Sequence, residues 1–308
     1  MSTSEDVSWD TLRRIIRQWA GNGVDIAEIR HLHGGAVSNT LGLTLDDGRK
    51  AVLKISPHRV DRSLVREAQQ LNHLRFLGVP VPTVYQWRLA DLDEPDSYVL
   101  MEFVEGVDLA QAKEQLSRAE FDAVQEDLAR IVVTMHRQVG KAYMRVGATG
   151  TDGAEFSSWP AFFRGVYDGM WRELEKDPHT TAACRKHFNK VHDRLETLLA
   201  HDDQPRLVHW DLWTANVLVG PNGKVGAILD PVCKYAHAEA ELAYLELFQT
   251  VTPAFMKAYR RELPVSPDYE KRRRDVYQLY FLMDHAAFFG GPYHEKLAAA
   301  AAKVAATL

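Results

Sequence analysis

The sequence predicts an α+β chain with a small β-rich part, residues 1–103, followed by a larger, mainly helical part, residues 104–308. Apolar residues alternate with a period of two between residues 41 and 55, the pattern typical of strands. After residue 117 they recur at helical spacing over most of the chain. The segment Val104–Gly106 separates the two patterns, and 308 residues are enough for two domains.

The composition is that of an ordinary folded, globular protein. Hydrophobic residues make up 46% and charged residues 26% of the chain, which excludes a disordered or collagen-like protein. The net charge of −5 gives no overall electrostatic reason to bind nucleic acid. Cys184 and Cys233 form no CxxC pair, so we expect a reducing, cytoplasmic compartment and no zinc site. The acidic N-terminus and the lack of an 18-residue apolar run predict neither a signal peptide nor a membrane contact, and the sequence leaves the oligomeric state open.

The first elements are a helix and a hairpin. Residues 9–19 carry one apolar helical face, and Gly21 is expected to end this helix. Residues 41–45 and 51–55 each alternate, and Asp46-Asp47-Gly48 between them is a turn signal. Helical spacing then returns over residues 61–77, and further strands are expected at 83–88 and 97–103.

The second part is predicted to be helical with a short β insert. Ser117 and Glu120 form a capping box that opens a helix reaching Met135. Further helices are expected near 160–176 and 180–200, from about residue 239 onward, and in the alanine-rich tail 297–308. The β insert comprises residues 207–208, 217–219 and 225–229. The basic run Lys271–Arg274 is interpreted as a solvated helix start.

The most informative motif is His209-x-Asp211-x4-Asn216, the catalytic-loop pattern of kinase-type folds. An Asp there can meet an acceptor hydroxyl, while the Asn on the same loop reaches a magnesium ion. Asp230 lies 19 residues after Asp211, at the end of a predicted strand, where a carboxylate can hold Mg²⁺ against nucleotide phosphates. The alternative makes both Asp residues turn residues and Asn216 a cap at the start of a strand.

The N-terminal part supplies candidates for nucleotide binding. Lys54 lies on the second strand of the hairpin, opposite the apolar face, like the lysine that contacts nucleotide phosphates in kinases. Glu67 on the next helix is its expected partner. Three further sets of candidates are the glycines Gly34 and Gly35, the hydroxyl of Ser38 near the phosphates, and the main chain of Glu102 and Val104 at a purine edge.

Together these residues resemble the aminoglycoside phosphotransferase and choline kinase superfamily, and within it most closely the fructosamine (ketosamine) kinases. The likeness covers about residues 30–293 and is densest after residue 206. His209-Trp210-Asp211-Leu212-Trp213 resembles the H-G-D-L-W of that family, and the segment from Asp230-Pro231 to Leu242-Ala243 resembles its D-P-x-x-x-Y-G-H-x-E-x-[DE]-L-A. Residues 267–293 follow its C-terminal helix pattern.

The resemblance implies a bilobal protein-kinase-like fold and an ATP-dependent transfer of phosphate to a hydroxyl of a sugar-like small molecule. It makes Asp211 the catalytic base and His209 a brace for the catalytic loop. It also makes Asn216 and Asp230 the Mg²⁺ ligands, and Lys54 and Glu67 the pair that holds the phosphates. The sequence does not distinguish ATP from GTP.

Departures from the family pattern gather on the acceptor side. Trp210 and Ala236 stand where the pattern has Gly, and Asp284 stands where Asn is expected. The side chains that we expect near the acceptor are Trp210, Trp213, Glu239, Glu241 and Asp284. Glu239 and Glu241 have an equal alternative as internal braces of the helix that starts there.

The first choice of acceptor is a ketosamine or related amino sugar. An alternative is a resistance phosphotransferase acting on an aminoglycoside, a nucleoside or another hydroxylated antibiotic. A third reading, from another class, is a pseudokinase that binds nucleotide without turnover. The intact set of Lys54, Asp211, Asn216 and Asp230 argues against this third reading.

Overall fold

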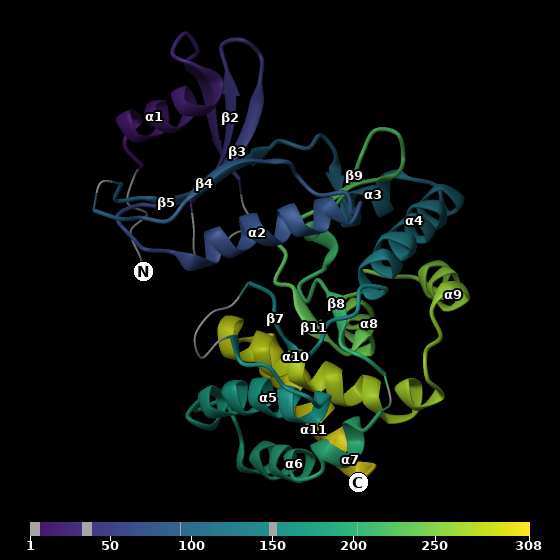
Figure 1. Cartoon of the computed structure of the whole chain (residues 1–308). Coiled ribbons are helices and arrows are strands. Elements are labelled where there is room, and N and C mark those ends of the chain that lie inside the picture. Colours follow the sequence, from purple (N-terminus) through teal and green to yellow (C-terminus); the bar gives the residue numbers. More distant parts are fainter. Residues whose placement is uncertain (1–6, 33–38, 93, 148–152, 202) are drawn as a thin grey trace. The chain divides into compact units, whose positions relative to one another are not determined.

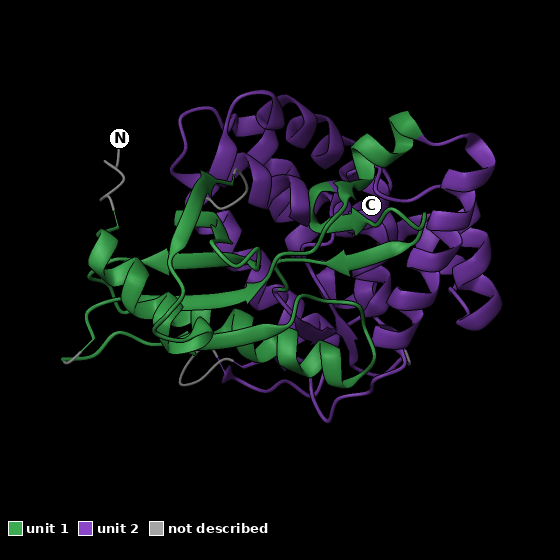
Figure 2. Ribbon diagram, turned by 90° about the horizontal axis from the view of Figure 1, so that it is seen from above, with its two compact units in different colours: residues 1–115, 215–231 green, residues 116–214, 232–308 purple. Residues whose placement is uncertain are grey.

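The computed structural model describes residues 7–32, 39–92, 94–147, 153–201 and 203–308 (Figure 1). The chain divides into two compact units, coloured separately in Figure 2. Unit 1 comprises residues 1–115 and 215–231, and unit 2 comprises residues 116–214 and 232–308. Unit 1 thus contains both Asn216 and Asp230, which a division at residue 103 would assign to the second domain.

Unit 1 is built on a five-stranded antiparallel sheet in the order β1-β2-β3-β5-β4. Two helices accompany it, α1 (Trp9–Ala20) and α2 (Arg62–Phe76), and a short helix α3 (Leu109–Gln115) follows. The strands are β1 (Ile26–His31), β2 (Asn39–Leu45), β3 (Lys50–Ser56), β4 (Val84–Arg88) and β5 (Ser97–Glu102). The predicted hairpin, the helix over 61–77 and the two later strands are therefore confirmed.

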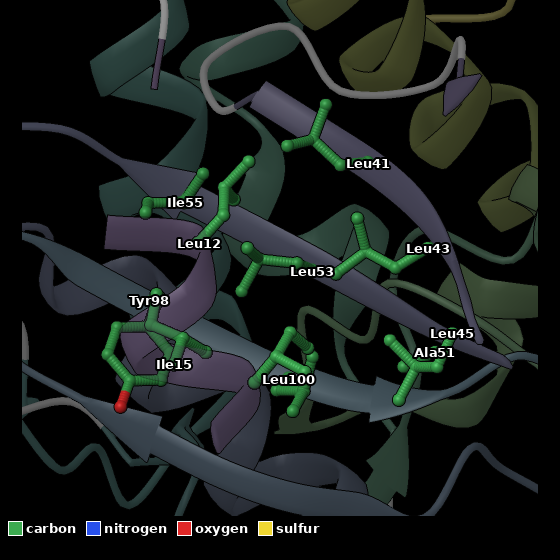
Figure 3. Packing of buried hydrophobic residues seen from close by; sticks show 11 residues of the cluster. Leu12, Ile15, Leu41, Leu43, Leu45, Ala51, Leu53, Ile55, Tyr98 and Leu100 are labelled. Atoms are coloured by element: carbon green, nitrogen blue, oxygen red, sulfur yellow. The ribbon is translucent and has the colours of Figure 1, made fainter. Parts of the chain in front are cut away.

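The alternation in the hairpin has the expected consequence for burial. Leu53 on β3 pairs with Leu41 on β2 and with Leu100 on β5, and all three are buried. These residues form one core with Ile15 of α1 (Figure 3). The full cluster is Leu12, Ile15, Ile16, Leu41, Leu43, Leu45, Ala51, Leu53, Ile55, Tyr98 and Leu100. Because side chains alternate along a strand, Lys54 lies on the opposite face of β3 from this core.

Strand β1 was missed by the sequence analysis. Four of its six residues are exposed, and its two partly buried apolar residues, Ile26 and Ile29, are three apart rather than two. A register shift between Ile26 and Glu28 breaks the alternation. Because β1 is an edge strand with a bulge, its sequence lacks the alternation of apolar and polar residues that predicts a strand.

A second sheet of unit 1 has the order β10-β9-β6 and joins segments that are far apart in the sequence. Its strands are β6 (Val107–Asp108), β9 (Val217–Val219) and β10 (Val225–Ile228). Gly106 packs so closely on β9 that an added Cβ would lie 2.6 Å from the carbonyl oxygen of Val219. The β9–β10 hairpin confirms two strands of the predicted β insert, and Asn216 and Asp230 flank it. The third predicted strand, residues 207–208, pairs instead with Lys234–Ala236 in a separate sheet.

Unit 2 is mainly helical, as predicted. Its longer helices are α4 (Arg118–His136), α5 (Trp159–Glu175), α6 (Ala182–His192), α8 (Ala238–Leu247), α9 (Pro253–Glu262), α10 (Arg274–Phe289) and α11 (Pro292–Ala306), with the short α7 (Leu195–Leu199). The capping box of Ser117 and Glu120 opens α4 as predicted. A π-helical turn, Tyr269–Arg273, leads into α10, which packs against α8, α5 and α11.

A small sheet in unit 2 has the order β7-β11-β8. Its strands are β7 (Met144–Arg145), β8 (Arg206–Val208) and β11 (Lys234–Ala236). The catalytic-loop motif starts immediately after β8, and α8 starts two residues after β11. Within the described ranges, no helix is long and apolar enough to cross a membrane.

Candidate active site

In unit 1, the structure brings together three of the predicted site residues. Lys54 of β3 donates to Glu67 of α2 over 2.8 Å between Nζ and Oε1. The same ammonium also donates to Oδ1 of Asp230. The predicted Lys54–Glu67 pair therefore exists as a contact, and Asp230 joins it from a segment 176 residues further along the chain.

The charges of this cluster do not balance. Burial disfavours the Lys54 ammonium, but Glu67 and Asp230 outweigh that effect and raise the pKa of Lys54. Burial raises the pKa of Glu67, and Lys54 opposes this rise only in part while the carboxylate of Asp230 adds to it. One ammonium thus serves two carboxylates, and a further cation would offset the excess negative charge.

Asn216 and Asp230 are held close by the base of the β9–β10 hairpin. The amide N–H of Leu229 donates to the carbonyl oxygen of Asn216 over 2.9 Å. Asp230 follows at once with a φ of +53°, a left-handed conformation that Asp tolerates better than most residues. This backbone turns the chain sharply where the strand ends, and such backbones are concentrated at functional sites.

The residues present suit a magnesium ion that is shared with phosphates. An amide oxygen and a carboxylate are hard oxygen donors, and Mg²⁺ commonly takes one or two protein ligands and completes its shell with phosphate and water. In the part of the chain that the structure describes, no three His, Cys, Asp or Glu side chains are arranged to hold a metal without such help. Asn216 and Asp230 could hold such an ion together with phosphate oxygens.

The structure says less about the other residues that are predicted to bind a nucleotide. Glu102 uses its backbone N–H and its carboxylate internally, donating to the carbonyl of Thr83 and accepting from the amide and hydroxyl of Thr83. Val104 lies in the segment between β5 and β6. Gly34, Gly35 and Ser38, the predicted phosphate-covering residues, lie outside the described residues.

In unit 2, the loop after β8 carries Asp211, whose backbone N–H and carbonyl form hydrogen bonds with His209 and Trp213. His209 is fully buried, and its Nδ1 accepts from the backbone N–H of Asp211 over 3.3 Å. The carbonyl of His209 accepts from the amide of Val232, which links the loop to the chain beyond Asp230. Trp213 lies further along the loop with its side chain exposed, and its amide donates to the carbonyl of Asp211.

The backbone conformation at Trp210 accounts for the glycine that the family pattern has at this position. The φ of Trp210 is +74°, a conformation that glycine adopts freely and that is rare for a bulky residue. Glu241 of α8 holds this strained peptide, because its Oε1 accepts from the N–H of Trp210 over 2.6 Å. The ring is buried and packs against Phe281 and Tyr280 of α10.

Glu241 is the centre of a buried hydrogen-bond chain. A carboxylate can only accept, so the Nε2–H of His136 on α4 donates to Oε2 over 2.8 Å. The other ring nitrogen of His136 lies 2.8 Å from the hydroxyl of Tyr259 on α9. Burial favours a raised pKa for Glu241, but the hydrogen bond and charge of His136 and the N–H of Trp210 lower it below the ordinary value.

Glu239 is also committed internally. It forms a bidentate pair with Arg273, at 2.6 Å and 3.0 Å, and both side chains are buried. The basic run Lys271–Arg274 is therefore not a wholly solvated helix start, because Arg273 faces inward. The geometry of Glu239 and Glu241 favours the bracing alternative over contact with an acceptor.

Two charged side chains, Lys234 and Asp284, lie near Trp210 and Asp211. Lys234 of β11 is buried, and its Nζ lies 4.3 Å from the centre of the Trp210 ring. Burial, with Arg145 adding to it, lowers the pKa of Lys234 to about 7. Asp284 of α10 is one-third exposed, and burial together with the charge of Asp211 raises its pKa to about 6, against the opposing effect of Lys234.

Three residues of this region were missed by sequence reasoning. Tyr244 of α8 donates its hydroxyl to Oδ1 of Asp211 over 2.6 Å. Lys234 contacts the ring of Trp210, and His136 forms a hydrogen bond with Glu241. The available signals were weak: a lysine between apolar strand residues, and a tyrosine three positions after a buried glutamate on a helix.

The sheet of unit 1 and the catalytic loop of unit 2 define a protein-kinase-like fold. The profile of the fructosamine kinase family matches residues 8–306, so the chain belongs to the fructosamine kinase family. The chain is accordingly an ATP-dependent kinase for a sugar-like substrate.

Individual relatives agree with this assignment. A Synechocystis protein named "Probable ketoamine kinase" is 26% identical over 311 residues, covering 96% of each chain. A protein of the same description from Vibrio parahaemolyticus is 33% identical over 138 residues, an alignment that spans 45% of this chain and 46% of that protein.

Solved structures confirm the fold. A fructosamine-3-kinase candidate from Haemophilus somnus superposes with a TM-score of 0.78 at 17% identity, covering 96% of this chain and 97% of that one. The aminoglycoside phosphotransferase APH(4)-Ia gives a TM-score of 0.69, also at 17% identity, with 96% and 98% covered. At this level of identity, the likeness concerns the fold and not the substrate.

Replacing Glu241 with Ala is expected to lower the free energy of unfolding by about 3–5 kcal/mol, because two buried donors lose their acceptor. The measurement is urea unfolding at neutral pH. Glu262→Ala is the control, since Glu262 pairs with Arg137 on the surface and its loss should cost less than about 1 kcal/mol. Equal losses in the two variants would contradict the bracing role of Glu241.

The buried ammonium of Lys234 predicts a pH dependence. Above about pH 7 the folded state has released this proton, whereas the unfolded chain keeps it to about pH 10.4. The unfolded state then binds more protons, so stability rises with pH relative to Lys234→Met, by at most about 1.4 kcal/mol per pH unit. Urea unfolding of both proteins between pH 7 and 9 tests this, with Lys224→Met as an exposed control. Parallel profiles for wild type and Lys234→Met would refute it.

Proposed function

We propose that this kinase transfers the γ-phosphoryl group of ATP to a hydroxyl of a ketosamine or a related amino sugar. The observation that carries the proposal is the match to the fructosamine kinase family over residues 8–306. The hydrogen-bonded Asp211 on the catalytic loop supports it, because this is the side chain that such a reaction needs.

On the nucleotide side, Lys54 is proposed to contact the phosphates and Glu67 to keep its ammonium in place. Asn216 and Asp230 are proposed to hold Mg²⁺, which when bound neutralises the charge that develops on the phosphoryl oxygens. The excess of carboxylate charge around Lys54 supports this assignment. Asp230 already contacts Lys54, so a single cluster would orient both the cation and the phosphates.

On the acceptor side, Asp211 is proposed to receive the acceptor hydroxyl and orient its oxygen toward the γ-phosphorus. The new bond joins this oxygen to phosphorus, the bond from phosphorus to the β–γ bridging oxygen breaks, and ADP leaves. The proton of the hydroxyl passes to Asp211 and then to solvent. Catalysis is therefore mostly positioning and charge neutralisation.

Asp284 favours an acceptor that carries a positive charge. The amine of a ketosamine is protonated at neutral pH, and a partly exposed carboxylate near Asp211 is a suitable partner for it. With a pKa of about 6, Asp284 is ionised at pH 7 and can form this pair. A neutral ketose lacks the cation, so we expect it to be the poorer substrate.

The test is ADP production with Mg²⁺-ATP against a ketosamine, the matching neutral ketose, an amino sugar and an aminoglycoside. We expect the ketosamine to give the highest kcat/KM and omission of Mg²⁺ to abolish turnover. Asp211→Asn should lower kcat by at least about 100-fold while ATP binding, followed by calorimetry, is kept.

Asp193→Asn is the matched control, because Asp193 is an exposed residue at the end of α6 and should leave turnover unchanged. Preference for the aminoglycoside would favour the antibiotic phosphotransferase instead. If no acceptor raises ADP production, and Asp211→Asn behaves like Asp193→Asn, the proposed function is wrong.

A further inference from the structure

The hydroxyl of Tyr244 makes a short hydrogen bond to the side chain that is proposed to act as the base. Its Oη lies 2.6 Å from Oδ1 of Asp211, and Tyr244 is 2% exposed. No part of the family pattern used above includes a residue at position 244. The proposed function assigns no role to Tyr244 itself.

The ring of Tyr244 is held in place by its neighbours. Phe281 of α10 packs edge-on against it with ring centres 4.8 Å apart, and Phe248, just after α8, lies at 4.7 Å. A buried ring between two others has little freedom to rotate away from Asp211. The position of the hydroxyl is thus set by the α8–α10 packing.

The hydroxyl also keeps its proton at every pH at which a kinase works. Burial and the nearby charge of Asp211 raise the pKa of Tyr244 far above its usual value. Tyr244 therefore donates to Asp211 as a neutral partner throughout. A hydrogen bond to the ionised form of a carboxyl stabilises that form and lowers its affinity for protons.

Helix α8 holds the catalytic loop at two points. Glu241 and Tyr244 are three residues apart, a spacing that puts both side chains on one face of the helix. Glu241 accepts from the backbone N–H of Trp210, and Tyr244 donates to the side chain of the next residue, Asp211. The first contact fixes the peptide, and the second fixes the direction of the carboxylate.

We propose that Tyr244 is a positioning residue for phosphoryl transfer, which through its hydrogen bond holds the Asp211 carboxylate oriented toward the acceptor hydroxyl. This inference rests on the proposed function, since Asp211 is the base only if the chain phosphorylates a hydroxyl. The effect belongs to the reacting state more than to substrate binding, so it should act on kcat rather than on the KM for ATP.

The test is Tyr244→Phe, which keeps the ring packing and removes only the hydroxyl. With the best ketosamine, kcat is expected to fall about 10–100-fold while the KM for ATP changes less than about twofold. The acid limb of the kcat–pH profile should move to higher pH, because Asp211 loses a donor to its ionised form. A purely structural tyrosine would not move this limb.

A second readout does not need turnover. The carboxyl ¹³C resonance of Asp211, assigned by its loss in Asp211→Asn, should titrate at higher pH in Tyr244→Phe than in the wild type. If no acceptor is phosphorylated, the proposed function fails, and this titration still decides whether Tyr244 controls Asp211.

Tyr167→Phe is the matched control. Tyr167 of α5 is equally buried, and its hydroxyl donates to the carbonyl of Phe188 over 3.3 Å. Its loss should cost about 1 kcal/mol of stability and leave kcat, the acid limb and the Asp211 titration unchanged. If Tyr244→Phe and Tyr167→Phe behave alike in these three readouts, the positioning role of Tyr244 is overturned.

Discussion

The geometry of the predicted catalytic loop depends on the hydrogen bonds that the buried carboxylate of Glu241 accepts. This carboxylate accepts from the N–H of Trp210, a residue whose positive φ stores strain, and from His136, which in turn contacts Tyr259. A residue other than glycine adopts a positive φ only where contacts with its surroundings stabilise that conformation. Side chains of α4 and α8 therefore meet at this carboxylate, and Tyr259 of α9 joins them through His136. The same carboxylate holds the peptide N–H of the residue before Asp211.

Charge is distributed differently around the two sets of site residues. In unit 1, one ammonium, Lys54, contacts two carboxylates, Glu67 and Asp230, so the cluster is suited to a divalent cation and phosphates. In unit 2, Lys234 lies over the Trp210 ring, and burial lowers its pKa. Burial also raises the pKa of Asp284, and Lys234 opposes this rise only in part. One face of the Trp210 ring is thus occupied by the amino group of Lys234, and the carboxylate of Asp284 is partly open to solvent.

Local patterns predicted the elements that local patterns encode. The alternation around Leu53 predicted β3 and its core face, and the Ser117 capping box predicted the start of α4. The catalytic and metal-binding roles of Asp211 and Asp230 stay predictions. Contacts between side chains that lie far apart in the chain could not be predicted from the sequence. The sequence alone is equally compatible with Glu239 and Glu241 contacting an acceptor or bracing the helix. The bracing role follows from their contacts with Arg273 and His136, which lie far away in the chain. The contact of Tyr244 with Asp211 spans 33 residues and leaves no periodic trace, and the bulged edge strand β1 has none either.

The proposed reaction transfers the γ-phosphoryl group of ATP to a carbon-bound oxygen of a ketosamine. The most direct measurement is ³¹P NMR of the wild-type protein with Mg²⁺-ATP and a ketosamine. We expect the γ-phosphate resonance to decay while ADP and a phosphomonoester appear together, the latter split by coupling to hydrogen on the esterified carbon. Appearance of ADP with inorganic phosphate alone, or an unchanged ATP spectrum with every ketosamine, would contradict the account.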